Sequence, residues 1–172
     1  QLGDGTECTG GSWDSNYNNP TPAGCNANNG RYTPVIVDDS NFPTNSSIIS
    51  ISTGMAHSCA IIDNNDLYCW GRNDGGQLSI GSTDNGDFPT PQYVDSGVVA
   101  VATGNEHSCA LYTNQMVKCW GKNDQGQLGT GNLYYQNSPT AINLSSNIAL
   151  ISLETAYNLN CVISEDNTPY CW

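Results

Sequence analysis

Two segments of the chain repeat each other closely. Residues 57–78 read HSCAIIDNNDLYCWGRNDGGQL, and residues 107–128 read HSCALYTNQMVKCWGKNDQGQL. A third, shorter copy follows at nearly the same period of 50 to 52 residues, as the aligned cysteines and tryptophans show: Cys59, Cys109, Cys161 and Trp70, Trp120, Trp172. A period of this length is typical of solenoids, propellers and other repeat proteins. The chain is therefore predicted to consist of repeated structural units.

Each unit is predicted to hold four short strands. It begins with an apolar run of strand length, at residues 48–53, 98–103 and 150–155. In the first full unit a second strand is predicted over 57–62, a third over 66–71, and a fourth opening at the Gly-Gln-Leu of 76–78. Helical periodicity is lacking, and four strands per fifty residues is typical of a propeller blade. We predict an all-β fold of β-propeller blades with four antiparallel strands, about three blades' worth, belonging to a longer propeller or tandem array.

Prolines set the predicted unit boundaries. Pro34, Pro91 and Pro139 precede the three apolar runs, which divides the chain into repeats at 34–90 and 91–138 and an incomplete repeat at 139–172. Residues 1–33 are interpreted as the end of a preceding blade that carries an insertion over 7–30. The insertion has its own cysteine pair, Cys8 and Cys25, and two aromatic residues, Trp13 and Tyr17. It is either a contact loop or a decoration between blades.

The cysteine spacing predicts disulfides across hairpins. If Cys59 faces Cys69 on an antiparallel partner, then Ile62 faces Asp66 across a three-residue loop. Such loops usually end in a left-handed residue, which Asn65 and Asn167 tolerate and to which Gln115 is less suited. Opposed residues at a non-hydrogen-bonded site are close to disulfide distance. We therefore predict that each pair lies within one blade: Cys59–Cys69, Cys109–Cys119 and Cys161–Cys171.

A metal or redox site is the rival interpretation of these cysteines. Zinc ligands usually come closer together than ten residues, and no histidine completes a set in the third unit. We predict no metal site. Persistent disulfides indicate a compartment outside the reducing cytosol, so we predict an extracellular or cell-surface location.

Charge and composition agree with this location. Four basic residues stand against sixteen acidic ones, giving a net charge of −12. This charge repels phosphate backbones, so we expect no nucleic-acid partner; it suits a soluble surface, or one that attracts cations or basic partners. No apolar run reaches the length of a membrane span, and the first residues do not resemble a signal peptide. Asn45 and Asn143 begin possible N-glycosylation sequons.

Several residues recur together in both full units. They are Gly54, His57, Ala60, Trp70-Gly71, Asn73 and Gly76-Gln77-Leu78 in one, and Gly104, His107, Ala110, Trp120-Gly121, Asn123 and Gly126-Gln127-Leu128-Gly129 in the next. This combination resembles the tandem repeat of the regulator-of-chromosome-condensation family, which includes secreted propellers of the β-lactamase-inhibitor type. The resemblance covers the chain except residues 7–30 and implies a β-propeller, and the paired cysteines are similar to the secreted branch. The third unit departs from the pattern, because TAYNLNC at 155–161 lacks the Gly and the His. Members range from an exchange factor to ubiquitin ligases and inhibitors, so the resemblance implies no single function.

Chemistry-bearing residues are interpreted as structural. His57 and His107 occupy the same repeat position, so we predict strand residues that bond to a neighbouring blade rather than a catalytic base. Acidic turns such as Asp63 to Asp66 lack the full calcium-loop pattern. The three repeat tryptophans are predicted to pack between blades. We predict no catalytic residue, no enzyme activity and no cofactor.

The chain ends raise the question of assembly. Three blades are fewer than the four to eight of a closed ring, so either the chain is a window on a longer protein or copies assemble head to tail by strand addition. We predict a non-enzymatic, extracellular structural or adhesive repeat protein of a cell surface or filamentous appendage, whose partners are other subunits or copies of itself. The alternative is a secreted propeller module, inhibitor- or lectin-like, that binds proteins or glycans.

Overall fold

Three antiparallel sheets follow one another along the chain. A computed structural model describes residues 34, 36–81, 86–144 and 149–172, and these residues contain no α-helix. The first sheet has the order β1-β2-β3-β4, the second β5-β6-β7-β8 and the third β11-β10-β9. Their bounds are β1 Ile48–Thr53, β2 His57–Ile62, β3 Leu67–Arg72, β4 Asp87–Asp95, β5 Val98–Thr103, β6 His107–Tyr112, β7 Val117–Gly121, β8 Gln136–Ala141, β9 Leu150–Ala156, β10 Leu159–Ser164 and β11 Pro169–Cys171. The predicted all-β architecture of about three blades is confirmed.

The central hairpins have the predicted register. Cys59 faces Cys69, and the Ile62 N–H donates to the Asp66 carbonyl at 3.0 Å across the three-residue loop. The last loop residue is left-handed in all three hairpins, with φ values of 70° at Asn65, 66° at Gln115 and 63° at Asn167. Gln115 therefore adopts the same conformation as the two asparagines. The loop length, rather than the residue type, dictates the turn.

The fourth strand lies elsewhere than predicted. Gly76 to Leu78 form a tight turn, in which the Leu78 N–H donates to Asn73 Oδ1 at 3.0 Å and Gly76 has a φ of 81°. The fourth strands are β4 and β8, which pair with β3 and β7. Pro91 and Pro139 therefore lie inside these strands, and residues 91–95 and 139–141 complete the preceding sheet. Prolines are tolerated there because β4 and β8 are edge strands.

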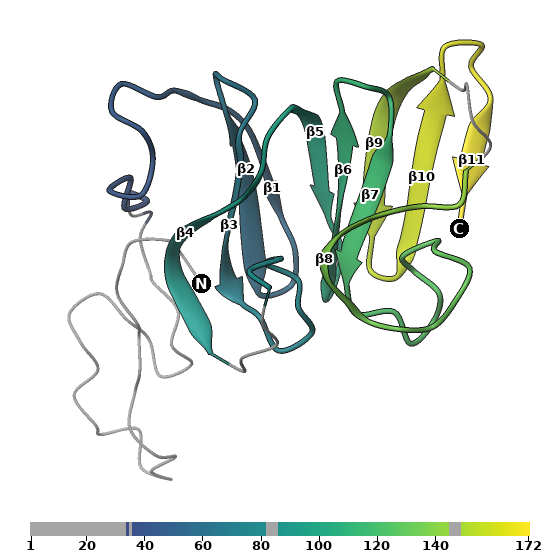
Figure 1. Ribbon diagram of the computed structural model, residues 1–172, viewed down its shortest axis with the longest axis horizontal. Helices are drawn as coiled ribbons and strands as arrows, with labels where there is room; N and C mark the ends of the chain where they lie inside the picture. The colour runs from purple at the N-terminus through teal and green to yellow at the C-terminus, as the bar shows by residue number, and fades with distance from the viewer. Residues whose placement is uncertain (1–33, 35, 82–85, 145–148) are drawn as a thin grey trace, which may run out of the picture.

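The sheets stack face to face in a row, as blades do (Figure 1). Two apolar cores fill the spaces between them. The first joins Cys59, Ile61 and Leu67 of the first sheet to Val101 and Trp120 of the second. The second core joins the second sheet to the third through the buried residues Cys109, Leu111, Val117, Leu153 and Val162. The second sheet contributes to both cores and is therefore apolar on both faces, which explains the continuously buried β6.

Candidate functional site

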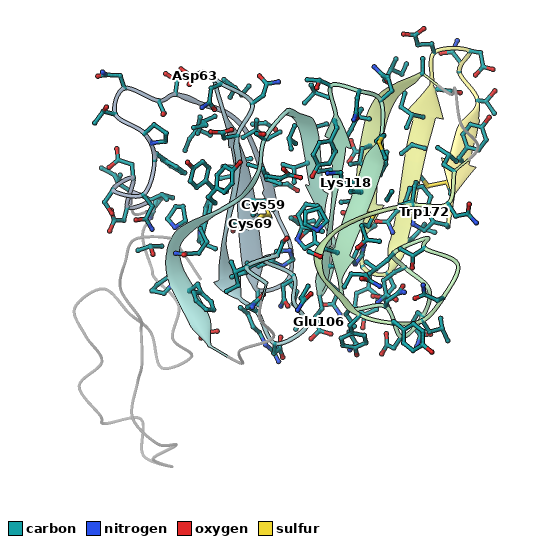
Figure 2. The ribbon with its side chains drawn as sticks, in the orientation of Figure 1. Cys59, Asp63, Cys69, Glu106, Lys118 and Trp172 are labelled. Carbon is teal, nitrogen blue, oxygen red and sulfur yellow. A yellow bond between two sulfur atoms is a disulfide. The ribbon has the colours of Figure 1, made fainter. Side chains whose placement is uncertain are left out.

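Two of the three described disulfides lie inside the blade interfaces. The three bridges join Cys59 to Cys69, Cys109 to Cys119 and Cys161 to Cys171, with Cα–Cα distances of 4.0, 4.1 and 4.2 Å, which confirms the predicted pairing. The first two bridges are completely buried, and Figure 2 shows Cys59 and Cys69 in the interior of the molecule. The third bridge is partly exposed at Cys161 and exposed at Cys171. All six cysteines in the part of the chain that the structure describes are oxidised, so none of these six is available as a nucleophile or as a thiolate ligand.

The two histidines also link neighbouring blades. His57 Nε2 lies 2.8 Å from Ser108 Oγ, and His107 Nε2 lies 2.8 Å from Asn160 Oδ1. Both rings are buried. Burial, together with the charge of His107, lowers the pKa of His57 to about 4, and burial lowers the pKa of His107 as well. Both side chains are therefore neutral at pH 7, as the predicted structural role requires.

A glycine makes room for each imidazole ring. A Cβ built on Gly54 would lie 2.6 Å from His57 Cε1 and 2.4 Å from the Gly104 carbonyl oxygen. A Cβ on Gly104 would lie 2.1 Å from His107 Cε1 and 2.7 Å from the Tyr157 carbonyl oxygen. Real Cβ atoms do not approach so closely, because protein interiors are already packed as densely as organic crystals. Gly and His therefore recur together because the histidine ring fits only where the glycine has no side chain.

The Gly-Gln-Leu turn provides the acceptor for the next blade. The Gln77 carbonyl accepts from Ser108 Oγ at 3.0 Å and from Trp120 Nε1 at 2.9 Å. One blade later the same arrangement recurs, with the Gln127 carbonyl accepting from Asn160 Nδ2 at 2.6 Å and Trp172 Nε1 at 3.1 Å. These bonds confirm that Trp120 and Trp172 pack between blades. They also explain why Gln-Leu recurs at a fixed distance from Trp-Gly.

One loop of the second blade departs from the repeat and carries exposed apolar side chains. Leu133, Tyr134 and Tyr135 are 62%, 75% and 47% exposed. The buried amide of Asn123 holds their backbone, since its Nδ2 donates to the Asn132 carbonyl at 2.8 Å and to the Tyr134 carbonyl at 3.0 Å. Exposed tyrosines on a loop whose backbone is fixed by hydrogen bonds suit a binding surface. They offer a large contact area and lose little side-chain entropy on binding.

A shallow cavity adjoins this loop. Its volume is about 450 Å³, and it is lined by Gly126, Gly129, Gly131, Asn132, Leu133 and Asn143. Three glycines and two asparagine amides make the lining rich in backbone groups and neutral hydrogen-bonding groups. Such a lining can bind a polar, uncharged ligand group, whereas the described residues include no cluster of His, Cys, Asp or Glu able to hold a metal ion.

Lys122 and Glu106 form an ion pair at one end of the second blade. Lys122 Nζ donates to Glu106 Oε2 at 2.7 Å, and this bond raises the pKa of Lys122. The labelled Glu106 and Asp63 lie at opposite ends of the strands in Figure 2. Glu106 lies in the turn between β5 and β6, whereas Asp63 lies in the hairpin loop between β2 and β3. The two ends of the blades therefore carry separate loop surfaces.

Sequence comparison identifies the repeat. Profiles of the regulator of chromosome condensation (RCC1) repeat match residues 64–111 and 117–162, and a second profile of the same repeat matches 48–77 and 98–127. The chain belongs to the RCC1 repeat family. The matched residues include the first two hairpins, the histidines and the Gly-Gln-Leu turns whose contacts are described above.

Two curated proteins are similar in sequence to this chain over about the length of one repeat. The ultraviolet-B receptor UVR8 of Arabidopsis thaliana is 36% identical over 48 residues, which is 28% of this chain and 11% of the receptor. A bifunctional serine/threonine-protein kinase/NEDD4-like E3 ubiquitin-protein ligase of Dictyostelium discoideum is 47% identical over 49 residues, which is 28% of this chain and 3% of that protein. These matches cover too little of either protein to transfer an activity.

Two solved structures share the fold of this chain. Human WBSCR16 superimposes with a TM-score of 0.67 at 19% identity, over 76% of this chain and 34% of WBSCR16. Prp20p of Saccharomyces cerevisiae superimposes with a TM-score of 0.63 at 21% identity, over 73% of this chain and 33% of Prp20p. The chain therefore spans about a third of the propellers it resembles.

The remaining predicted site residues fall into two groups. Cys8, Cys25, Trp13 and Tyr17 lie outside the described residues. Asn45 and Asn143 are exposed on loops, Asn45 with a φ of 66° before β1 and Asn143 after β8. Both side chains are accessible, as glycosylation requires. Among the residues that the structure describes, no helix has the length and hydrophobicity of a membrane span.

The surface loop at 133–135 was not predicted from the sequence. Its signal was present, since Leu-Tyr-Tyr stands between Gly131 and Pro139 at a place where the other full repeat has no aromatic residue until Phe88. An apolar triplet in a segment rich in turn residues fits no strand or core position, and this mismatch favours a surface role.

Proposed function

We propose that this chain is a non-enzymatic, extracellular structural or adhesive element that belongs to a cell surface or filamentous appendage and assembles through its propeller blades. One observation carries the proposal: the contact between successive blades is modular. The Gln77 carbonyl with Trp120, and the Gln127 carbonyl with Trp172, repeat the same bond at 2.9 and 3.1 Å. A contact that repeats with the same atoms can be extended by further blades.

Three features support an extracellular location. Each of the three described blades has a disulfide, and structural disulfides persist mainly in oxidising compartments. The net charge of −12 keeps the surface soluble at high local concentration. Asn45 and Asn143 begin sequons and are exposed.

The chemistry of the described residues supports a role without catalysis. His57 and His107 are buried and bonded to the next blade, so neither can take a proton from a substrate. The cysteines of all three blades are in disulfides. The exposed groups on the loop surface are tyrosines, asparagines and glycines. These residue types are typical of surfaces that bind a partner.

The face of the third blade that carries Cys161 and Ile163 is suited to assembly. Ile163 is 39% exposed, whereas its repeat equivalents Ile61 and Leu111 are buried against the next blade. Leu159 takes the place of the two histidines and is also exposed. This face is therefore apolar, and the corresponding face of each of the other two repeats is covered by the next blade.

Assembly can be tested with the secreted, oxidised protein. Light scattering and negative-stain electron microscopy over a concentration series should show linear or extended assemblies. The variant Ile163→Asp places a charge on the open blade face and should abolish them, whereas Asn114→Asp, in an exposed hairpin loop, should leave them unchanged. Particles of one size at every concentration, equal for both variants and the parent, would contradict the proposal.

A second candidate is a secreted module that binds proteins or glycans. It is favoured by the loop surface of Leu133, Tyr134 and Tyr135 beside the cavity of about 450 Å³. In this case a glycan or protein array should give a ligand whose binding is lost in Tyr134→Ala. Tyr157→Ala, an equally exposed tyrosine in a different turn, is the matched control. Equal loss in both variants would argue against a site at this loop.

A further inference from the structure

The first strand of each described blade carries the same β-bulge. The register of β1 against β2 shifts between Ile48 and Ser50, so Ile49 has no partner on β2. Val99 of β5 and Ile151 of β9 are left without a partner in the same way. A bulge turns the side chain of its extra residue in a new direction. The same position of the repeat is therefore unpaired in each blade, and it holds a β-branched aliphatic residue each time. We call Ile49, Val99 and Ile151 the bulge residues.

The bulge residues are exposed at every place in the row of blades. Ile49, Val99 and Ile151 are 58%, 46% and 57% exposed. Val99 belongs to the second sheet, which packs against a described sheet on each side, so its exposure is not due to a missing neighbour. The position two residues further along behaves differently, because Val101 and Leu153 are buried against the preceding blade. Exposure at the bulge is therefore a property of the repeat.

The three first strands lie next to one another. Ser52 Oγ of β1 lies 2.9 Å from Thr103 Oγ1 of β5, and Ala102 of β5 packs in the same core as Leu153 of β9. Because the bulges occupy equivalent places on these adjoining strands, the bulge residues form one apolar row that crosses all three described blades. Exposed apolar side chains that gather in this way mark interaction surfaces, whereas single ones do not.

Acidic hairpin loops lie beside this row. The main-chain N–H groups of Asp63, Thr113 and Glu165 donate to the carbonyl two residues before each bulge, at 2.9, 2.8 and 2.8 Å. The loops that begin at these residues hold the exposed Asp63, Glu165 and Asp166 and contain no lysine or arginine. Among the described residues, neither Asp63 nor Glu165 forms an ion pair with a basic side chain. Their charges are therefore available to a partner.

The basic side chains of the described residues do not neutralise this end of the blades. The main-chain N–H groups of Arg72 and Lys122 donate to carbonyls in the turns before β2 and β6, which places both residues at the opposite end. Figure 2 shows the two ends, with Glu106 at the one and Asp63 at the other. Lys118 is already in an ion pair, at 3.0 Å. The apolar row is thus bordered by negative charge.

We propose that the row of bulge residues and the acidic hairpin loops beside it dock a basic, amphipathic segment of a partner protein. The aliphatic face of the segment covers Ile49, Val99 and Ile151, and its lysines or arginines lie towards Asp63 and Glu165. Aliphatic contact supplies the affinity, and the opposite charges select the partner and speed its association. The surface follows the first strands rather than the blade faces through which the chain is proposed to assemble. The inference therefore goes beyond the proposed function and does not rest on it.

Titration calorimetry with a synthetic peptide can test the apolar row. The probe is an amphipathic helix with leucine on one face and lysine on the other. We expect it to bind, and a peptide with glutamate in place of lysine not to bind. Val99→Asn should raise the Kd about tenfold, as the loss of one buried aliphatic side chain predicts. Met55→Asn, at an apolar position that is 71% exposed in the turn between β1 and β2, is the matched control and should leave the Kd unchanged.

The charged loops are tested in the same titration. Asp63→Asn should raise the Kd about threefold and reduce its dependence on salt. Asp87→Asn removes an equal charge at the opposite end, opposite Arg72, and should change neither. Thermal unfolding of each variant checks that the fold is kept, and Ile151→Asn replaces Val99→Asn if the latter unfolds.

Three results would overturn the docking surface: no binding of the leucine-lysine peptide, equal binding of the glutamate peptide, or equal loss in Val99→Asn and Met55→Asn. Assembly is measured separately by light scattering of the protein without peptide. Extended assemblies that form equally in Val99→Asn retain the proposed function even if the docking surface is refuted. Tight peptide binding without such assemblies retains the docking surface and refutes the proposed function.

Discussion

Acidification should weaken the contact between the first two blades through His57. The ring is buried, and its Nε2 lies 2.8 Å from Ser108 Oγ in the second blade. Its pKa is lowered to about 4 in the folded protein, against 6.5 for an ordinary histidine. Between these two values the unfolded chain binds a proton that the folded chain does not. The stability contribution of the neutral ring is therefore complete above pH 6.5 and is lost as the pH falls towards 4.

The size of this effect follows from the pKa difference. One pKa unit corresponds to about 1.4 kcal/mol, so the full difference is worth about 3 kcal/mol at pH 4 and about 2 kcal/mol at pH 5. Protonation of the sixteen acidic residues acts in the opposite sense, because it relieves the repulsion of a chain with a net charge of −12. The histidine effect must therefore be measured as a difference between two proteins.

Urea unfolding at pH 7.5 and pH 5 of the parent and of His57→Gln provides that difference. Glutamine keeps a polar group within reach of Ser108 but does not titrate, so the carboxylate effects cancel. We expect the parent to lose about 2 kcal/mol more free energy of unfolding than the variant between the two pH values. His107→Gln should give a change of the same sign, because burial lowers the pKa of His107 as well. The reasoning is refuted if the parent and His57→Gln lose equal stability.

Three further predictions concern the blade interfaces. The Cys161–Cys171 bridge is partly exposed, whereas the other two bridges are buried. A titration with dithiothreitol followed by peptide mapping should therefore find Cys161–Cys171 reduced first. Simultaneous reduction of all three bridges would show that burial does not protect them. Gly104→Ala places a Cβ 2.1 Å from a histidine ring carbon and should lower the free energy of unfolding by about 1–3 kcal/mol in denaturant titrations. Gly86→Ala is the control without a clash, because Gly86 is exposed, has no positive φ, and its added Cβ would lie 3.7 Å from the nearest atom, a Phe88 ring carbon. Trp120→Phe removes the donor to the Gln77 carbonyl and should cost about 1–3 kcal/mol; a loss no larger than that of an exposed-site substitution would show that the bond contributes little.

The hairpins could be predicted because they are local. A spacing of ten residues and a loop of three residues allow one register, and this register places Cys59 opposite Cys69. The residue types of the loop mattered less, since Gln115 adopts the left-handed conformation that asparagine favours. The histidine role was also predictable, because a residue that recurs in every full repeat is more easily explained by packing than by catalysis.

The fourth strand could not be found in the same way. Residues 87–95 contain Pro89 and Pro91 and have no clear alternation, so their propensity is poor for a strand. They are extended because the outer edge of β3 offers them backbone partners. The Gly-Gln-Leu segment looked like a strand, but its backbone turns at Gly76 and its Gln77 carbonyl is used by the next blade. The loop of residues 133–135 was missed for a related reason, since its exposure depends on how Asn123 holds it.

By itself the sequence determined the repeat period, which a comparison of successive units gives. It also determined the all-β class, the cysteine pairs and the three-residue turns, because each of these depends on residues close together in the chain. Tertiary structure alone decided which segments complete each sheet, which atoms the histidines and tryptophans bond, and which tyrosines stay exposed. These features depend on contacts across about 30 to 50 residues, between groups such as Trp120 Nε1 and the Gln77 carbonyl. Partners at such separations come together only when neighbouring blades pack, and no local preference in the sequence specifies them.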